Sequence, residues 1–243
     1  MIHSETKKPD LDNLEPEQET KGASKAKMSK NAEPTGPSTT FYMHSALLFG
    51  GRLLHKILNA YNSLFELTPQ ERAKIYRNIS THYAKKGLHD KAIDSLKDWV
   101  RLEPKSLDAN HQLGLALAAA GRAKEALRFF EKTLTLQPEH KGALFHRSSL
   151  LLKMKEYGKA IAGLEKVSTM TENPKVYYLL GVGYDKLGEL DKAMAAMEKA
   201  VSLEPNEIKY NQHLGFLNVR KDEHKKAAEY FTKVMELEHE EEV

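Results

Sequence analysis

Five alanines recur along this 243-residue chain at an almost constant interval. They are Ala92, Ala126, Ala160, Ala193 and Ala227, separated by 34, 34, 33 and 34 positions. A fixed period of a few tens of residues indicates that one supersecondary unit is stacked repeatedly. We therefore expect a solenoid in which each unit buries its apolar face against its neighbours.

Each unit also carries a small residue ahead of its alanine and a bulky residue four positions after it. The small residues are Ser80, Gly114, Ser148, Gly181 and Gly215, and the bulky ones are Leu96, Phe130, Leu164, Met197 and Phe231. Two helices that approach closely need a small residue at their crossing and a larger side chain beside it. Each unit is thus predicted to be a hairpin of two helices, A and B.

This pattern, together with Pro104, Pro138 and Pro205 at the ends of three units, resembles the tetratricopeptide repeat family. The resemblance covers five units, at residues 73–106, 107–140, 141–173, 174–207 and 208–241. It implies an all-α fold, a right-handed and hook-shaped solenoid of stacked helix-turn-helix hairpins.

The third unit departs from the pattern at two places. Arg147 stands where the other units have Ile or Leu, and Lys155 replaces the glycine of the turn between helices A and B. The unit is also one residue shorter than the others. We expect looser packing at residues 141–173 and a flexible joint there between two arms.

An apolar stretch precedes the repeats. Between residues 41 and 67, apolar side chains recur every three or four positions, which is typical of an amphipathic helix. We interpret residues 39–72 as a degenerate helical unit whose stripe is too wide for one neighbour to cover. The candidate self-assembly residues are Leu47, Leu54, Ile57, Leu58, Tyr61, Leu64 and Phe65. The alternative is a helix that folds back as an N-terminal cap.

Residues 1–38 are rich in charged and small polar residues and poor in apolar ones, so they are predicted to form a disordered tail. Met28 within this tail is an alternative start of the protein. No apolar core follows the N-terminal charges, so a secretory signal is not expected. With no cysteine in the chain, the sequence is compatible with a reducing cytoplasm.

The sequence offers little for catalysis, cofactors or nucleic acid. The formal net charge is only +3, which provides no global field toward nucleic acid. Phosphate-loop, HExxH and GxSxG motifs do not occur, so the chain is predicted not to be an enzyme and to hold no cofactor. No two histidines lie four positions apart, which argues against a metal site. His82, His111, His146 and His213 on the A helices are expected to be ordinary solvated side chains.

The inner face of such a solenoid is lined mainly by A helices. The candidate partner-binding residues there are Lys74, Arg77, Lys85, His111, Phe145, Lys153, Tyr178, Lys186, Phe216 and Arg220. The mixture of basic and aromatic side chains suits an acidic peptide with apolar anchors, although it is also compatible with ordinary solvation. Arg77 and Asp185, three units apart, are a candidate salt bridge between the two arms.

The run from Phe41 through FELTPQERAKIYRN and STHYAKKGLHDKAI to LGVGYDKLGELDKAM resembles the magnetosome-associated tetratricopeptide proteins of magnetotactic bacteria. That resemblance implies a cytoplasmic scaffold that forms large homo-oligomers through its N-terminal unit. It also implies a peripheral coat on the magnetosome membrane, attached through a protein receptor, which recruits or activates other magnetosome proteins for biomineralisation. Two alternatives stay open: a monomeric peptide-binding adaptor in another bacterial pathway, and a regulatory subunit of an enzyme.

Overall fold

The computed structural model describes residue 56 and residues 67–241, and within that range it contains ten helices and no strand. They are α3 (Pro69–Lys85), α4 (His89–Leu102), α5 (Leu107–Ala119), α6 (Ala123–Leu136), α7 (Lys141–Lys153), α8 (Tyr157–Met170), α9 (Pro174–Leu187), α10 (Leu190–Leu203), α11 (Ile208–Arg220) and α12 (His224–Glu241). Each predicted unit contains one pair of these helices, so the all-α repeat fold is confirmed.

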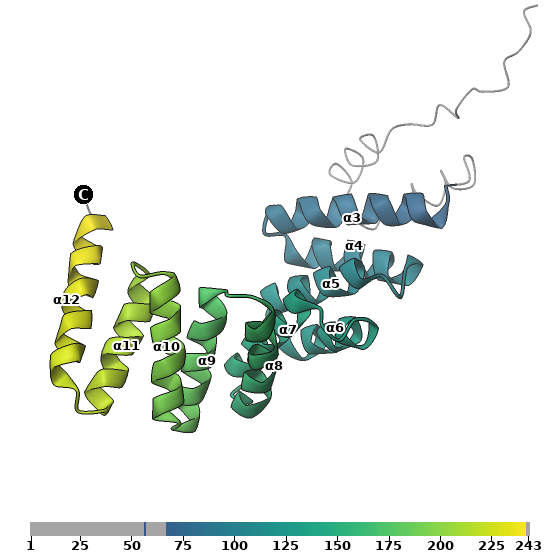
Figure 1. The fold of residues 1–243 in the computed structure, drawn as a ribbon. Helices are drawn as coiled ribbons and strands as arrows, with labels where there is room; N and C mark the ends of the chain where they lie inside the picture. The colour runs from purple at the N-terminus through teal and green to yellow at the C-terminus, as the bar shows by residue number, and fades with distance from the viewer. Residues whose placement is uncertain (1–55, 57–66, 242–243) are drawn as a thin grey trace, which may run out of the picture. The chain divides into compact units, whose positions relative to one another are not determined.

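The helices follow one another as hairpins, and each hairpin stacks on the next (Figure 1). Every odd-numbered helix is the A helix of a repeat and packs against the B helix that follows it. The first repeat is thus α3 and α4, and the fifth is α11 and α12. Each B helix then packs against the next A helix along the chain. This arrangement produces an array whose contacts are local in sequence.

Side chains at the A helices' N-termini explain where these helices begin. Thr68 forms a capping box with Glu71, and its hydroxyl accepts from the Glu71 backbone N–H. The Ser106 hydroxyl caps α5 by accepting from the Ala109 backbone N–H, and the Asn173 side-chain oxygen caps α9 by accepting from the Lys175 backbone N–H. Such caps satisfy backbone donors that have no partner inside the helix. Because of the Thr68 cap, α3 begins at Pro69, ahead of the predicted repeat start at residue 73.

The crossing of helices A and B has the geometry that the small and bulky residues predict. A Cβ atom on Gly114 would lie 2.7 Å from the Phe130 ring, and one on Gly215 would lie 2.8 Å from the Phe231 ring. At Gly181 the same atom would lie 2.7 Å from Met197. The five repeated alanines are all buried. Close helix approach therefore requires the small residues at these positions.

The third repeat keeps the fold despite its two unusual residues. Arg147 is half-buried, and its Nε lies 3.6 Å from Glu131 Oε1 on α6. Lys155 adopts a left-handed backbone with φ 64° at the turn position that is Gly87, Gly121 and Gly188 in three other repeats and Asp222, with φ 60°, in the fifth. A side chain is disfavoured in this conformation by about 1 kcal/mol. The third turn is therefore strained relative to the glycine turns.

Helix α7 is also where one hydrophobic cluster gives way to the next. Ala143 and Leu150 belong to the cluster that begins at Ala73, whereas Leu144 and Leu151 belong to the cluster that continues through α8 and α9. Leu127 and Leu134 of α6 pack against both. The flexible joint at residues 141–173 remains a prediction. The strained turn at Lys155 is the physical reason to expect it.

The tail at 1–38 and the seven candidate self-assembly residues between Leu47 and Phe65 lie outside the described residues. Most of the predicted unit at 39–72 lies outside them as well. No helix in the described part of the chain is long and apolar enough to cross a membrane.

Candidate protein-interaction surfaces

Two neighbouring cavities open along the first three repeats. The cavity of about 260 Å³ is lined by Ser80, Thr81, Ala84, His89, Leu96, Gln112, Leu115, Ala116 and Ala119. The cavity of about 490 Å³ is lined by Leu115, Ala118, Ala119, Gly121, Ala123, Phe130, His146, Ser149, Leu150, Lys153 and Met154. Leu115 and Ala119 of α5 line both, so we call the two together the inner groove.

The inner groove exists because α5 carries small side chains on this side. Ala118 and Ala119 leave space that larger residues would fill, and Leu115 forms the ridge between the two cavities. Neither lining includes an aspartate or glutamate, while Lys153 contributes a positive charge to the larger cavity. The groove therefore suits apolar side chains of a ligand that also carries negative charge.

The ten predicted partner-binding residues occur on all five A helices. Six of them are exposed basic side chains: Lys74, Arg77, Lys85, Lys153, Lys186 and Arg220. Phe145 and Tyr178 are half-buried, and Phe216 is 56% exposed. Of the ten, Lys153 lines the inner groove. The partner-binding role of all ten remains a prediction.

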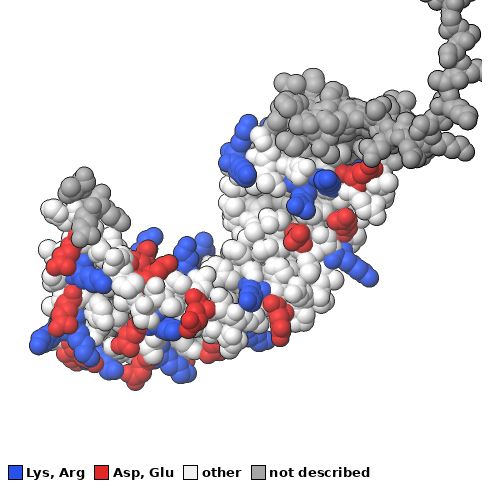
Figure 2. Space-filling view, turned by 45° about the horizontal axis from the view of Figure 1, so that its top comes forward, with Lys and Arg blue, Asp and Glu red and all other residues white. Residues whose placement is uncertain are grey.

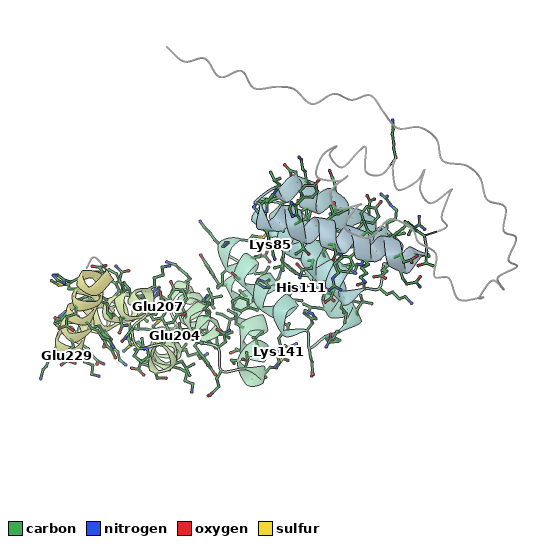
Figure 3. All side chains as sticks on the ribbon, turned by 90° about the horizontal axis from the view of Figure 1, so that it is seen from above. Lys85, His111, Lys141, Glu204, Glu207 and Glu229 are labelled. Atoms are coloured by element: carbon green, nitrogen blue, oxygen red, sulfur yellow. The ribbon has the colours of Figure 1, made fainter. Side chains whose placement is uncertain are left out.

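Three histidines, one on α5, one at the N-cap of α7 and one on α7, meet beside the larger cavity. The His111 ring on α5 lies 4.8 Å from the His140 ring and 5.6 Å from the His146 ring on α7, measured between centroids. Phe130 contacts two of them, at 5.9 Å from His111 and 6.1 Å from His146. Figure 3 labels His111 among the helices of the central repeats. We call His111, His140 and His146 the histidine cluster.

Within the histidine cluster, His140 also caps the N-terminus of α7. Its Nδ1 accepts a hydrogen bond of 3.0 Å from the backbone N–H of Ala143, which caps α7. The acceptor nitrogen must be unprotonated for this bond to form. The N-terminus of α7 therefore depends on a neutral imidazole, whereas α3 and α5 are capped by hydroxyls.

The surroundings of the histidine cluster disfavour positive charge. Burial, together with the neighbouring His140 and His146 rings, lowers the pKa of His111 to about 4. Burial also lowers the pKa of His146, with His140 adding to the effect. These imidazoles are consequently neutral at physiological pH.

A second polar group joins the fourth and fifth repeats. Asp185 on α9 forms an ion pair with Arg220 on α11, and its Oδ2 lies 3.6 Å from His213 Nε2. Tyr178 stacks on Tyr210 with ring centroids 5.0 Å apart and contacts His213 edge-on. Burial lowers the pKa of His213, and Lys186 adds to the shift.

The structure corrects the expectation about the four A-helix histidines, and it gives Asp185 other partners than the predicted one. His82, His111, His146 and His213 are half-buried and contact other rings, so they are not ordinary solvated side chains. The described partners of Asp185 are Arg220 and His213, and Arg77 is not among them. The predicted pairing of Arg77 with Asp185 stays a prediction without a contact to support it.

Sequence reasoning missed the histidine cluster because it searched for pairs within one helix. His111 and His146 are 35 positions apart, close to one repeat period, and equivalent positions of adjacent repeats lie side by side in a solenoid. The spacing of His111 and His146, which is close to the repeat period, was therefore the sequence signal that could have predicted the cluster. Among the described residues, no group of three or more acidic or histidine side chains has an arrangement suited to a metal ion.

Comparisons with known proteins agree with the repeat architecture. Tetratricopeptide repeat models match residues 174–207 and 111–169, and a model of the bacterial transcriptional activator domain matches residues 20–139. The repeat-containing protein MJ0940 of Methanocaldococcus jannaschii is 33% identical over 84 residues, which are 35% of this chain and 26% of that protein. This chain therefore spans about a quarter of that relative.

Solved structures match over a larger part of the chain. A MamA structure from Desulfovibrio magneticus RS-1, which begins at its residue 41, is 46% identical with a TM-score of 0.69. The match covers 71% of this chain and 98% of that one. Another MamA crystal structure is 29% identical with a TM-score of 0.65, covering 70% of this chain and 93% of that one.

The hairpin repeats, their sequence matches and the shared backbone define a tetratricopeptide repeat scaffold for protein–protein interaction. At 46% identity over nearly the whole length of a solved relative, the chain belongs to the MamA family.

Proposed function

We propose that this protein is a self-assembling scaffold that coats the cytoplasmic face of the magnetosome membrane. The observation that carries the proposal is the 46% identity to MamA across the repeat array. Large homo-oligomers would form through residues 39–72, which supply more apolar side chains than one neighbouring repeat can cover. Attachment to the membrane would be peripheral and through a protein receptor.

The proposed role of the coat is organisational and non-catalytic. The repeats would present their surfaces to other magnetosome proteins and recruit or activate them for biomineralisation. The inner groove supports such recruitment, because apolar cavities beside Lys153 suit a partner segment with apolar and acidic side chains.

Localisation in a magnetosome-forming bacterium tests the membrane part of the proposal. A fluorescent fusion of the full chain should follow the magnetosome chain, and the protein should leave the isolated magnetosomes in high salt without detergent. A fusion that stays diffuse in the cytoplasm would contradict the proposed coat. A control fusion of the fluorescent protein alone sets the diffuse level.

A monomeric peptide-binding adaptor is the second candidate function, and the inner groove is the observation that favours it. A fluorescein-labelled decapeptide of alternating aspartate and leucine is a suitable probe, with a serine version as its control. An adaptor binds the aspartate–leucine peptide as a monomer. A scaffold is instead expected to assemble in the absence of any peptide, so solution mass and peptide affinity together distinguish the two.

A further inference from the structure

The larger cavity of the inner groove has two ionisable nitrogen-bearing side chains in its wall, His146 and Lys153. Both belong to α7 and are seven positions apart, which places them on the same side of the helix and about 10 Å apart along its axis. Leu115 of α5 and Leu150 of α7 line the same cavity. The wall thus combines apolar surface with two groups that can donate hydrogen bonds to an anion.

Aromatic neighbours hold the His146 ring in this wall. The Phe130 ring stacks on it with centroids 6.1 Å apart and an interplanar angle of 21°, and the His111 ring lies 5.6 Å away. Phe145 approaches edge-on, at 5.2 Å between centroids. Because these rings restrict its orientation, His146 is positioned before any ligand arrives.

The other two members of the histidine cluster are poorly suited to accept a proton. His140 Nδ1 accepts from the Ala143 backbone N–H, so a proton on that nitrogen would remove the cap of α7. The pKa of His111 is lowered to about 4, and the two neighbouring rings contribute to that shift. His146 is therefore the cluster member that lines the cavity and can take up one proton there.

The helices packed against α7 bring few charges to His146. On α5, Asp108 acts on His111, and on α6, Glu131 lies 3.6 Å from Arg147. Burial and His140 lower the pKa of His146, and no charged group on the described parts of α8 or α9 contributes to that shift. A carboxylate supplied by a ligand would therefore give His146 an acidic neighbour that the described chain does not provide.

Such a carboxylate and the proton on His146 would stabilise each other. An opposite charge within a few ångströms favours the protonated imidazole, which burial otherwise disfavours. By linkage, the proton then strengthens carboxylate binding by the same factor by which the carboxylate strengthens proton binding. Lys153 adds a positive charge to the same cavity at either pH.

The charge of the cavity wall indicates the chemistry of its occupant. On the face of the molecule shown in Figure 2, basic and acidic side chains are intermixed, whereas the cavity lining contains Lys153 and no aspartate or glutamate. Residues 39–65 of this chain contain no carboxylate side chain, so they do not meet this requirement. A segment of another protein with aspartate or glutamate beside leucine-like side chains does.

We propose that the larger cavity of the inner groove binds a carboxylate side chain of a partner protein together with one proton, which His146 holds. The inference rests on the proposed recruitment of partners by the inner groove and adds what controls it. Partners are held more tightly as the pH falls and are released as it rises.

Peptide binding to the full-length protein at two pH values tests the proposal. The probes are a rhodamine-labelled decapeptide of alternating aspartate and leucine and its asparagine–leucine version. Fluorescence anisotropy should give a Kd for the aspartate peptide that is roughly 10-fold lower at about pH 5.5 than at about pH 7.5. Aspartate, with an ordinary pKa of about 3.9, stays ionised at both. The asparagine peptide should change less than about 2-fold, and circular dichroism checks the fold at each pH.

Substitutions locate the proton. His146→Gln should reduce the ratio of the two Kd values from roughly 10 to less than about 2. His213→Gln is the matched control, because burial also lowers the pKa of His213 but this residue lies on α11, outside the cavity lining. His140→Asn retains a capping oxygen and should keep the ratio. In the NMR spectrum, the aspartate peptide should raise the pKa of His146, and the asparagine peptide should not.

The possible failures are distinguishable. Peptide binding that is independent of pH, or a pH dependence that disappears in His140→Asn and persists in His146→Gln, overturns the proton-linked site and leaves the inner groove as a binding surface. Absence of binding at both pH values contradicts the groove itself, and with it this inference. A wild-type assembly that grows at the lower pH without binding the peptide would show that the carboxylate comes from a second copy, which contradicts a separate partner.

Discussion

The junction between the second and third repeats and the junction between the fourth and fifth have the same backbone but different polar groups. At the first, the His111 and His146 rings pack against Phe130, the His140 ring packs against His111, and burial lowers the pKa of His111 and His146. At the second, Asp185 forms an ion pair with Arg220 beside His213. One repeat architecture thus accepts a junction built around clustered imidazoles, next to the Arg147–Glu131 pair, and a junction built around the Asp185–Arg220 pair.

The contrast teaches that repeats of one fold respond differently to solvent conditions. A cluster of buried neutral imidazoles is weakened by acid, because protonation introduces charges into a poorly solvated site. An ion pair near the surface is weakened by salt, because mobile ions screen it. The turn before α8 adds a further difference, since Lys155 occupies a left-handed conformation that glycine adopts in other repeats.

Truncation of the central aromatic residue should have the largest effect. Phe130 is fully buried, so Phe130→Ala is expected to cost about 3–5 kcal/mol of stability. Met197→Ala is the matched control at the same position of the fourth repeat, with an expected cost of about 2–5 kcal/mol. Urea unfolding measures both losses. Only Phe130→Ala should also raise the pKa of His111 by admitting water, and an unchanged His111 titration in the NMR spectrum would contradict the described packing.

Acidification should have the next largest effect, through His111 of the histidine cluster, although the lowered pKa of His213 makes the other junction acid-sensitive as well. The pKa of His111 is depressed to about 4 in the folded protein, with Asp108 opposing the shift. The unfolded chain therefore binds a proton that the folded chain does not, between the ordinary histidine value near 6.5 and about 4. The stability that the neutral His111 contributes is fully present above pH 6.5, and it decreases as the pH falls toward 4.

The expected loss from His111 between pH 7 and pH 5 is about 1–2 kcal/mol. Thermal unfolding of the wild type and of His111→Gln at both pH values isolates the contribution. The difference between the two proteins should shift in favour of His111→Gln at pH 5. If both proteins lose the same stability on acidification, His111 does not carry the effect.

Relief of the strained turn should have a smaller effect of the opposite sign. Lys155→Gly should stabilise the third repeat by roughly 0.5–1 kcal/mol, because glycine adopts a positive φ without steric cost. Gly188→Ala in the equivalent turn of the fourth repeat should destabilise by a comparable amount. Denaturant midpoints measure both, and amide exchange in α7 and α8 should slow in Lys155→Gly. Exchange that is already uniformly slow across residues 141–173 would refute the predicted joint.

Removal of the ion pair should have the smallest effect. Asp185→Asn is expected to cost about 1 kcal/mol or less, since Arg220 is half-exposed and water screens the pair. The loss should diminish in 1 M salt, where screening already weakens the wild type. A loss that is independent of salt would indicate that Asp185 acts through packing rather than through charge.

The fold was predictable because the repeat determines both local structure and packing. Ala126 and Gly114 indicate the helix crossing, and each recurs at one interval, so one unit explains the next. The histidine cluster and the partner of Asp185 were not predictable in the same way, because they depend on which side chains of adjacent repeats touch.

The solution mass of the full-length chain tests the proposed self-assembly most directly. Light scattering after size exclusion should give a large assembly for the wild type and a monomer for Leu54→Glu combined with Leu58→Glu, with the same helical content by circular dichroism. The account predicts this collapse because the apolar residues of 39–65 supply the contact between copies. A wild-type monomer, or a doubly substituted chain that keeps the mass of the wild type, would contradict it.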